Sequence, residues 1–62
     1  MLIMLKTWKT EKTEVILNYY NGLGIRGHIV DCDAYGVVFE DENYEKVYCI
    51  PYGAVKSIHP AT

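Results

Sequence analysis

The chain has 62 residues, of which 50% are hydrophobic and 13% aromatic, with a formal net charge of −2 at pH 7. This composition excludes a disordered chain, because enough apolar surface is present to form a core. The acidic balance argues against long-range attraction to a polyanion, since such binding depends on phosphates being neutralised by Lys and Arg. A chain this short forms one domain that is marginal alone, and such domains usually need a disulfide, a metal or a partner subunit.

The two cysteines, Cys32 and Cys49, have neither a CxxC motif nor metal-ligand spacing. They are predicted to be reduced and to act as small apolar residues that fill the interior. The apolar start, residues 1–5, is too short for a signal peptide or a membrane span. We therefore expect a cytoplasmic location and no membrane partner. With no disulfide and no metal indicated, self-association is the expected additional support.

Residues 1–13 are predicted to form either a short helix or a strand. A helix would place four residues on one face: Leu2, Leu5, Trp8 and Lys9. The threonines of this segment are poor helix formers, so a strand over residues 2–8 competes with the helix. The segment also contains half of the Lys and Arg residues: Lys6, Lys9 and Lys12. These lysines are interpreted either as a solvated face of the helix or as a rim that contacts phosphates weakly.

Residues 14–60 are predicted to form five short strands, over residues 14–20, 23–32, 35–40, 46–50 and 54–59. Asn21 and Gly22 are predicted to form a two-residue hairpin turn in which both have positive φ. Gly24 and Gly27 indicate bends or close backbone approaches in the second strand, which help a small barrel to close. The segment Pro51 to Gly53 separates the last two strands.

Short strands with glycine-marked bends predict an all-β fold, either an SH3-like or an OB-like barrel. The whole chain is one domain, with residues 1–13 preceding a barrel of residues 14–60. The predicted core residues of the barrel are Ile25, Ile29, Val30, Val37, Val38 and Phe39. The acidic segment 41–45 is predicted to be a solvated loop.

Asp31 and Asp33 resemble a carboxylate pair, since on a strand they would face the same side. A metal site or an acid–base pair would need further ligands, and none cluster nearby in the sequence. The alternative is a turn in which Asp side chains accept backbone N–H hydrogen bonds. No nucleophile–histidine grouping and no phosphate loop has local support, so we expect no enzyme activity, no metal and no cofactor.

The residues from Asn21 to Tyr35 follow the pattern NG-x-x-I-x-G-x-I-x-x-x-D-x-Y. This pattern resembles the first signature of the Sm-like (LSm) RNA-binding family in its Hfq-like form. Residues 47–58, VYCIPYGAVKSI, fit the outline of the second signature, a short strand, a one-turn corner and another short strand. The resemblance covers residues 14–60. It implies a strongly bent five-stranded barrel with a short N-terminal helix, assembled as a homo-oligomeric ring of five to eight subunits.

The resemblance also implies roles for single residues. In Sm-like proteins the aromatic at the position of Tyr35 stacks on a base, and the aspartate at that of Asp33 helps to hold the RNA-contacting loop. The alternative for Tyr35 is an aromatic strand residue without a binding role. Arg26 is the only basic residue in the first signature and is therefore the candidate phosphate contact, the alternative being a solvated strand residue. Tyr52 would provide a second stacking face or pack on the barrel.

Two departures from family patterns bear on function. Eukaryotic Sm proteins have Asn where this chain has Val37. Hfq-like members also lack that Asn, and the chain is similar to them in this respect. Hfq-like members carry Tyr-Lys-His in the corner before the last strand, where this chain has Pro51, Tyr52 and Gly53. We therefore expect weak binding of single-stranded RNA, or of single-stranded DNA. The alternative hypothesis is an SH3-like structural or protein-interaction module without nucleic-acid binding.

Overall fold

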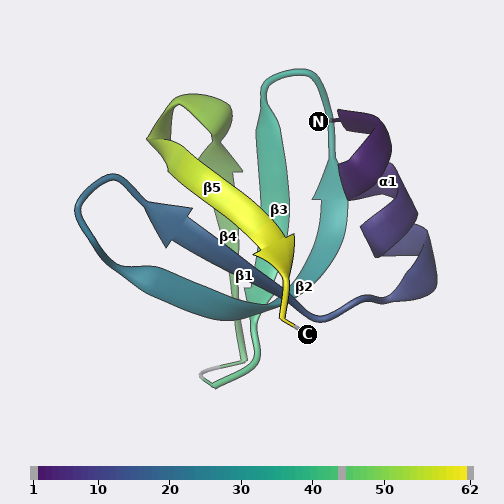
Figure 1. Cartoon of the computed structure of the whole chain (residues 1–62). Coiled ribbons are helices and arrows are strands. Elements are labelled where there is room, and N and C mark those ends of the chain that lie inside the picture. Colours follow the sequence, from purple (N-terminus) through teal and green to yellow (C-terminus); the bar gives the residue numbers. More distant parts are fainter. Residues whose placement is uncertain (1, 44, 62) are drawn as a thin grey trace.

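The computed structural model describes residues 2–43 and 45–61. These residues form a helix followed by five antiparallel strands in one sheet (Figure 1). The elements are α1 (Leu2–Glu11), β1 (Val15–Tyr19), β2 (Gly24–Cys32), β3 (Gly36–Asp41), β4 (Lys46–Pro51), the 3₁₀ turn η1 (Tyr52–Ala54) and β5 (Val55–Pro60). The predicted all-β fold with five strands is confirmed, and each strand lies within a few residues of its predicted position.

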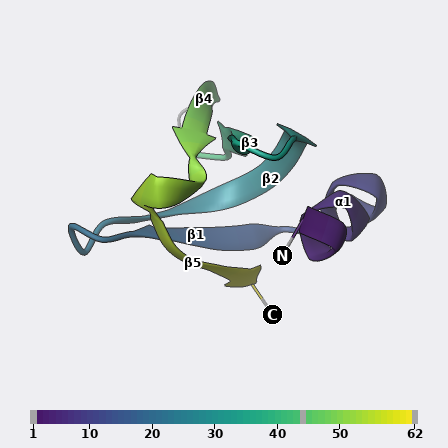
Figure 2. The ribbon, with the colours of Figure 1, turned by 90° about the horizontal axis from the view of Figure 1, so that it is seen from above.

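The sheet is strongly bent but not closed into a barrel. Its strand order is β4-β3-β2-β1-β5, so β5 pairs with β1 although it follows β4 in the chain. Figure 2 shows β1 and β5 in one layer and β3 and β4 in another, with the curved β2 running between the two. The strands β4 and β5 are thus the two edges of the sheet.

The core lies between these two layers and combines residues from α1 and all five strands. Its buried members are Leu5, Val15, Leu17, Ile29, Val37, Phe39, Ile50 and Val55. Of the predicted core, Ile25 packs against this cluster, but Val30 is 47% exposed and Val38 lies outside the cluster. Those two predictions are wrong because neighbouring strand residues point to opposite faces, and Ile29, Val37 and Phe39 occupy the inner one.

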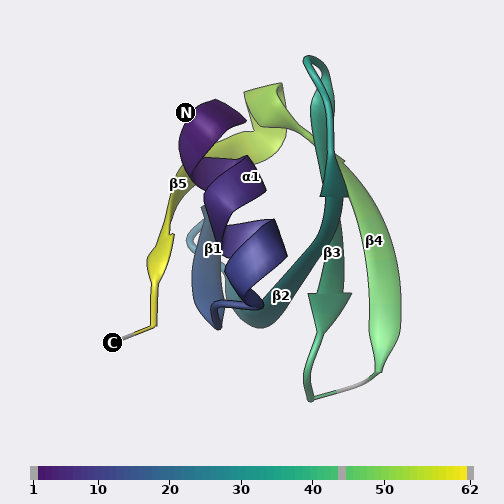
Figure 3. The ribbon, with the colours of Figure 1, turned by 90° about the vertical axis from the view of Figure 1, so that its right-hand side faces the viewer.

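The N-terminal segment is the helix α1, so the competing strand interpretation is wrong. Leu5 is buried and Trp8 packs against the core, so this face of α1 covers one side of the bent sheet beside β2 (Figure 3). The helix ends where Lys12 adopts a left-handed conformation with φ of 55°. The N–H groups of Lys12 and Thr13 donate to the carbonyls of Lys9 and Trp8, a Schellman arrangement that satisfies the helix end.

The hairpin between β1 and β2 differs from the predicted two-residue turn. Only Gly22 has positive φ, at 89°, and the Tyr19 N–H donates to the Leu23 carbonyl at 2.8 Å. The loop therefore has three residues, with Gly22 as the left-handed residue that forms the bulge. Asn21 contributes through its side chain instead, because its Oδ1 accepts the Leu23 N–H at 3.0 Å.

Cys32 is half-buried and Cys49 is exposed, and both are free cysteines in the structure. The prediction that Cys49 fills the interior is wrong, because it is exposed on the edge strand β4. Its neighbour Ile50 points inward, and Cys49 pairs with Val38 on the outer face. Within residues 2–43 and 45–61 no helix is long and apolar enough to cross a membrane. The same residues contain no group of three His, Cys, Asp or Glu side chains placed to hold a metal ion.

Candidate functional site

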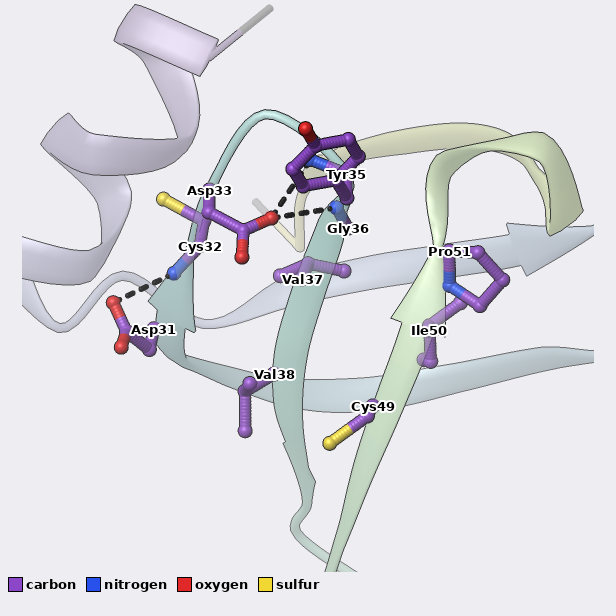
Figure 4. A pocket seen from close by; sticks show the side chains of 10 residues that line it. All are labelled: Asp31, Cys32, Asp33, Tyr35, Gly36, Val37, Val38, Cys49, Ile50 and Pro51. Carbon is purple, nitrogen blue, oxygen red and sulfur yellow. Dashed lines mark hydrogen bonds between the residues drawn. The ribbon is translucent and has the colours of Figure 1, made fainter.

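The hairpin loop between β2 and β3 is organised by the side chain of Asp33. Its Oδ1 accepts hydrogen bonds from the backbone N–H groups of Tyr35, at 2.7 Å, and Gly36, at 3.0 Å (Figure 4). The Asp33 N–H donates in return to the Gly36 carbonyl, at 3.1 Å. The turn interpretation of Asp33 is therefore confirmed. The expectation that Asp31 and Asp33 face the same side of a strand is wrong, because β2 ends between them at Cys32.

Tyr35 stands at the tip of this loop with 85% of its surface exposed. A second segment of the chain, the turn η1, forms hydrogen bonds to this loop through Tyr52. The Tyr52 N–H donates to the Tyr35 carbonyl at 3.1 Å, and the Tyr52 hydroxyl donates to the Asp33 carbonyl. The ring of Tyr52 packs against the core. Burial raises the pKa of the Tyr52 phenol, and the nearby Cys32 and Asp33 raise it further, so its hydroxyl remains a donor.

A groove of about 340 Å³ lies beside Tyr35, between the ends of β2, β3 and β4 (Figure 4). It is lined by Asp31, Cys32, Asp33, Tyr35, Gly36, Val37, Val38, Cys49, Ile50 and Pro51. Two of these residues are acidic and none is basic. The surface is thus mainly apolar, with an exposed aromatic ring, one carboxylate at the end of β2 (Asp31) and one in the loop that follows it (Asp33).

Asp31 connects this region to the helix. Its Oδ1 accepts the Cys32 N–H at 2.8 Å and a hydrogen bond from Lys9 Nζ at 3.1 Å. The Cys32 N–H, and after it Lys9, lowers the pKa of the Asp31 carboxyl below its ordinary value. Asp31 follows a bulge, since the pairing of β2 with β3 shifts register between Ile29 and Asp31.

The structure brings three of the four candidate site residues together within one chain: Asp33, Tyr35 and Tyr52. Arg26 lies near the opposite end of β2, where its carbonyl accepts the Glu42 N–H and its Nε contacts Glu14 Oε1 at 3.4 Å. Proximity in the sequence was a poor guide here, because the extended β2 separates Arg26 from the loop. Its role as a phosphate contact therefore stays a prediction.

Sequence reasoning did not place Val38, Cys49 and Pro51 beside Tyr35. The pairing register of β3 with β4 would have identified these residues. Val38 pairs with Cys49 and Gly36 pairs with Pro51, so the β3–β4 hairpin brings these residues to one region. It also missed that Lys9 holds Asp31, a contact between residues 22 positions apart.

A short N-terminal helix, the strand order β4-β3-β2-β1-β5 and a one-turn corner before the last strand define the Sm-like fold in its Hfq-like form. Among solved structures, the chain is similar to the 1.55 Å crystal structure of the pleiotropic translational regulator Hfq. The TM-score is 0.84 and the sequence identity 27%, over 90% of each chain. No protein-family model and no curated protein matches the sequence.

Proposed function

We propose that this protein binds single-stranded RNA weakly by stacking bases on Tyr35, and that it does so as a ring of its own copies without enzymatic activity. The observation that carries the proposal is the exposure of Tyr35, whose surface is 85% accessible to solvent. Tyr35 lies in a loop that is fixed by hydrogen bonds to Asp33, and the fold is similar to that of a translational regulator. A tyrosine this exposed contributes little to the core of its own chain. Its face is free to bind a base, and such stacking stabilises by about 1–3 kcal/mol per base.

The two free edges of the sheet support the proposed ring. The edge strand β4 is exposed along most of its length, and it includes the apolar Val47 at 56% exposure. Pairing of β4 with β5 of a neighbouring subunit would cover both edges, which otherwise favour aggregation. A contact between two different surfaces generates a closed ring when the rotation from one subunit to the next adds up to a full turn. We propose five to eight subunits, so that several copies of Tyr35 act on one strand.

Electrostatics limit the affinity of this site. The chain is acidic overall, and the groove beside Tyr35 has two carboxylates and no basic residue. Arg26 is partly exposed and paired with Glu14 at the surface, a pairing that a phosphate could replace at little cost. Few phosphates would be neutralised in this arrangement. The affinity for RNA should accordingly fall only slowly with added salt.

The test is fluorescence anisotropy with short RNA oligonucleotides at low salt. Tyr35→Ala should weaken binding by about 1–3 kcal/mol per stacked base and leave the secondary structure and assembly unchanged. Tyr20→Ala is the matched control, because Tyr20 is also highly exposed but lies in the hairpin at the other end of β2. Equal binding by wild type and Tyr35→Ala would remove Tyr35 from the site.

One observation favours a second function, that of a protein-interaction module. Two carboxylates in an apolar groove are suited to a basic peptide as well as to a base. Absence of RNA binding by the wild-type protein at low salt would favour this second function over the first.

A further inference from the structure

The surface beside the edge strand β4 is acidic. Among the described residues of the hairpin from β3 to β4, three carboxylates and one ammonium group are exposed: Glu40, Glu42, Glu45 and Lys46. At the other end of β4, the groove beside Tyr35 adds the carboxylates of Asp31 and Asp33 and no basic residue. Asp31 is partly neutralised by Lys9, whose Nζ lies 3.1 Å from its Oδ1. Negative charge is therefore present near both ends of this edge.

The opposite edge, β5, has the reverse character. Residues 51–62 contain no Asp and no Glu. Within β5, all of which the structure describes, the two exposed side chains are Lys56 and His59. Glu14 lies beside the end of β5, where its carbonyl accepts the Ala61 N–H at 2.9 Å, but its carboxylate is paired with Arg26 at 3.4 Å. The edge β5 thus presents an ammonium group and an imidazole to a neighbouring molecule.

The directions of the two strands decide which charges would meet. The strand β4 runs toward the turn η1 and β5 runs away from it, so the two are oppositely directed in space (Figures 1 and 3). A neighbour related by rotation about an axis along these strands would therefore place its β5 antiparallel to β4, with the η1 ends at the same height. Lys56 is close to η1 in β5, and Pro51 of the groove is close to η1 in β4. Lys56 of the neighbour would then face the acidic groove, and His59 the acidic hairpin.

Pairing between identical edges has the opposite electrostatic outcome. Two β4 edges, or two β5 edges, would meet in a two-fold dimer instead of a ring. The first arrangement brings acidic surface against acidic surface, and the second brings Lys56 and His59 against their own copies. Like charges brought together across an interface are unfavourable and suppress the wrong pairing.

We propose that the opposite charges of its two edges make this chain pair β4 with β5 of another copy, and that Lys56 of each subunit faces the acidic groove of the next. The inference rests on the proposed ring and gives the reason why the edges would form a ring in preference to a dimer. Its partner is a second copy of this chain, recognised by charge as well as by backbone hydrogen bonds.

Lys56→Glu is the decisive variant, studied by light scattering over a range of protein concentrations. At low salt it should raise the concentration at half-assembly by at least about threefold, because an attraction at every interface becomes a repulsion. Added salt screens both interactions. It should therefore weaken assembly of the wild type and strengthen assembly of Lys56→Glu, and this opposite response would not follow from a purely structural role of Lys56.

Two controls accompany this variant. Lys6→Glu makes the same change of charge at an exposed position of α1, on neither edge of the sheet, and should assemble as the wild type does. Lys56→Arg keeps the positive charge and should also assemble normally. Circular dichroism of each variant checks that the fold is retained.

The possible results separate the inference from the ring itself. If a ring forms and Lys56→Glu assembles with the same midpoint and salt response as the wild type, the role of Lys56 is wrong and the ring stands. If Lys6→Glu is as disruptive as Lys56→Glu, net charge controls assembly and the assignment to Lys56 fails. A wild-type mass of two chains would overturn the selection against identical edges, and a wild-type monomer would overturn both proposals.

Discussion

Gly27 shows how one missing side chain sets the geometry of the sheet. A Cβ at this position would lie 1.8 Å from the Glu40 carbonyl oxygen and 3.0 Å from the ring of Phe39. Gly27 pairs with Asp41 where β2 is shared by both layers, so β3 crosses its backbone closely. The sequence predicted this close approach, because a glycine within a strand marks a bend or a place where another backbone comes near.

Gly27→Ala should therefore destabilise the protein by about 3 kcal/mol, as overpacking against backbone atoms that cannot move aside. Gly53→Ala is the control, since a Cβ there has open space and the residue does not have positive φ. That change should be neutral or slightly stabilising. Urea unfolding at a fixed protein concentration measures both, and equal midpoints for the two variants would contradict the close approach.

At the scale of elements, the sequence predicted the order and type of the strands better than their connections. Alternation and turn residues located all five strands, because these signals are local. The bulge after Ile29, the three-residue loop at Gly22 and the Lys9–Asp31 contact depend on partners distant in sequence. The Asp33–Tyr35 corner was identified because it matches the family pattern. The distance of Arg26 from that corner could not be predicted without knowing the course of the strand β2.

The pair formed by Lys9 and Asp31 joins α1 to β2 at the surface. Because the pKa of Asp31 is lowered in the folded state, its contribution to stability is present at neutral pH and is lost as the pH falls through that lowered value. The difference in urea midpoint between wild type and Asp31→Asn should thus be largest near neutral pH and should vanish in strong acid. The fluorescence of Trp8, which packs against the core, reports the unfolding.

Lys6→Met is a suitable control in this titration, because it removes an exposed charge from the same helix without touching Asp31. A gap between wild type and Asp31→Asn that stays constant from neutral to acid pH would show that the pair does not stabilise the helix.

At the scale of the whole molecule, the open sheet is the dominant feature. The two edges β4 and β5 are joined by η1, so the corner that holds Tyr35 also connects the two surfaces available for pairing. Any assembly through these edges would therefore repeat the Tyr35 loop at equivalent positions around the axis.

Light scattering at micromolar concentration should give a mass of five to eight times the 7.1 kDa chain. Val47→Lys places a charge on the exposed edge strand and should reduce this mass, because charged residues on an edge oppose pairing. Val47→Thr keeps the β-branched shape and should assemble as wild type does. A monodisperse wild-type monomer would contradict the ring.

The loop that contains Tyr35 is held by hydrogen bonds to the Asp33 carboxylate and from the Tyr52 hydroxyl. Lys9 of the helix contacts Asp31, which lies just before this loop. A flexible loop loses conformational freedom when it binds, at a cost of about 1–2 kcal/mol for each residue whose backbone becomes ordered. Residues 33–36 have already lost that freedom when the protein folds. A ligand would therefore order little of the protein beyond the ring of Tyr35 itself, so that the cost of ordering the loop is not subtracted from the stacking energy.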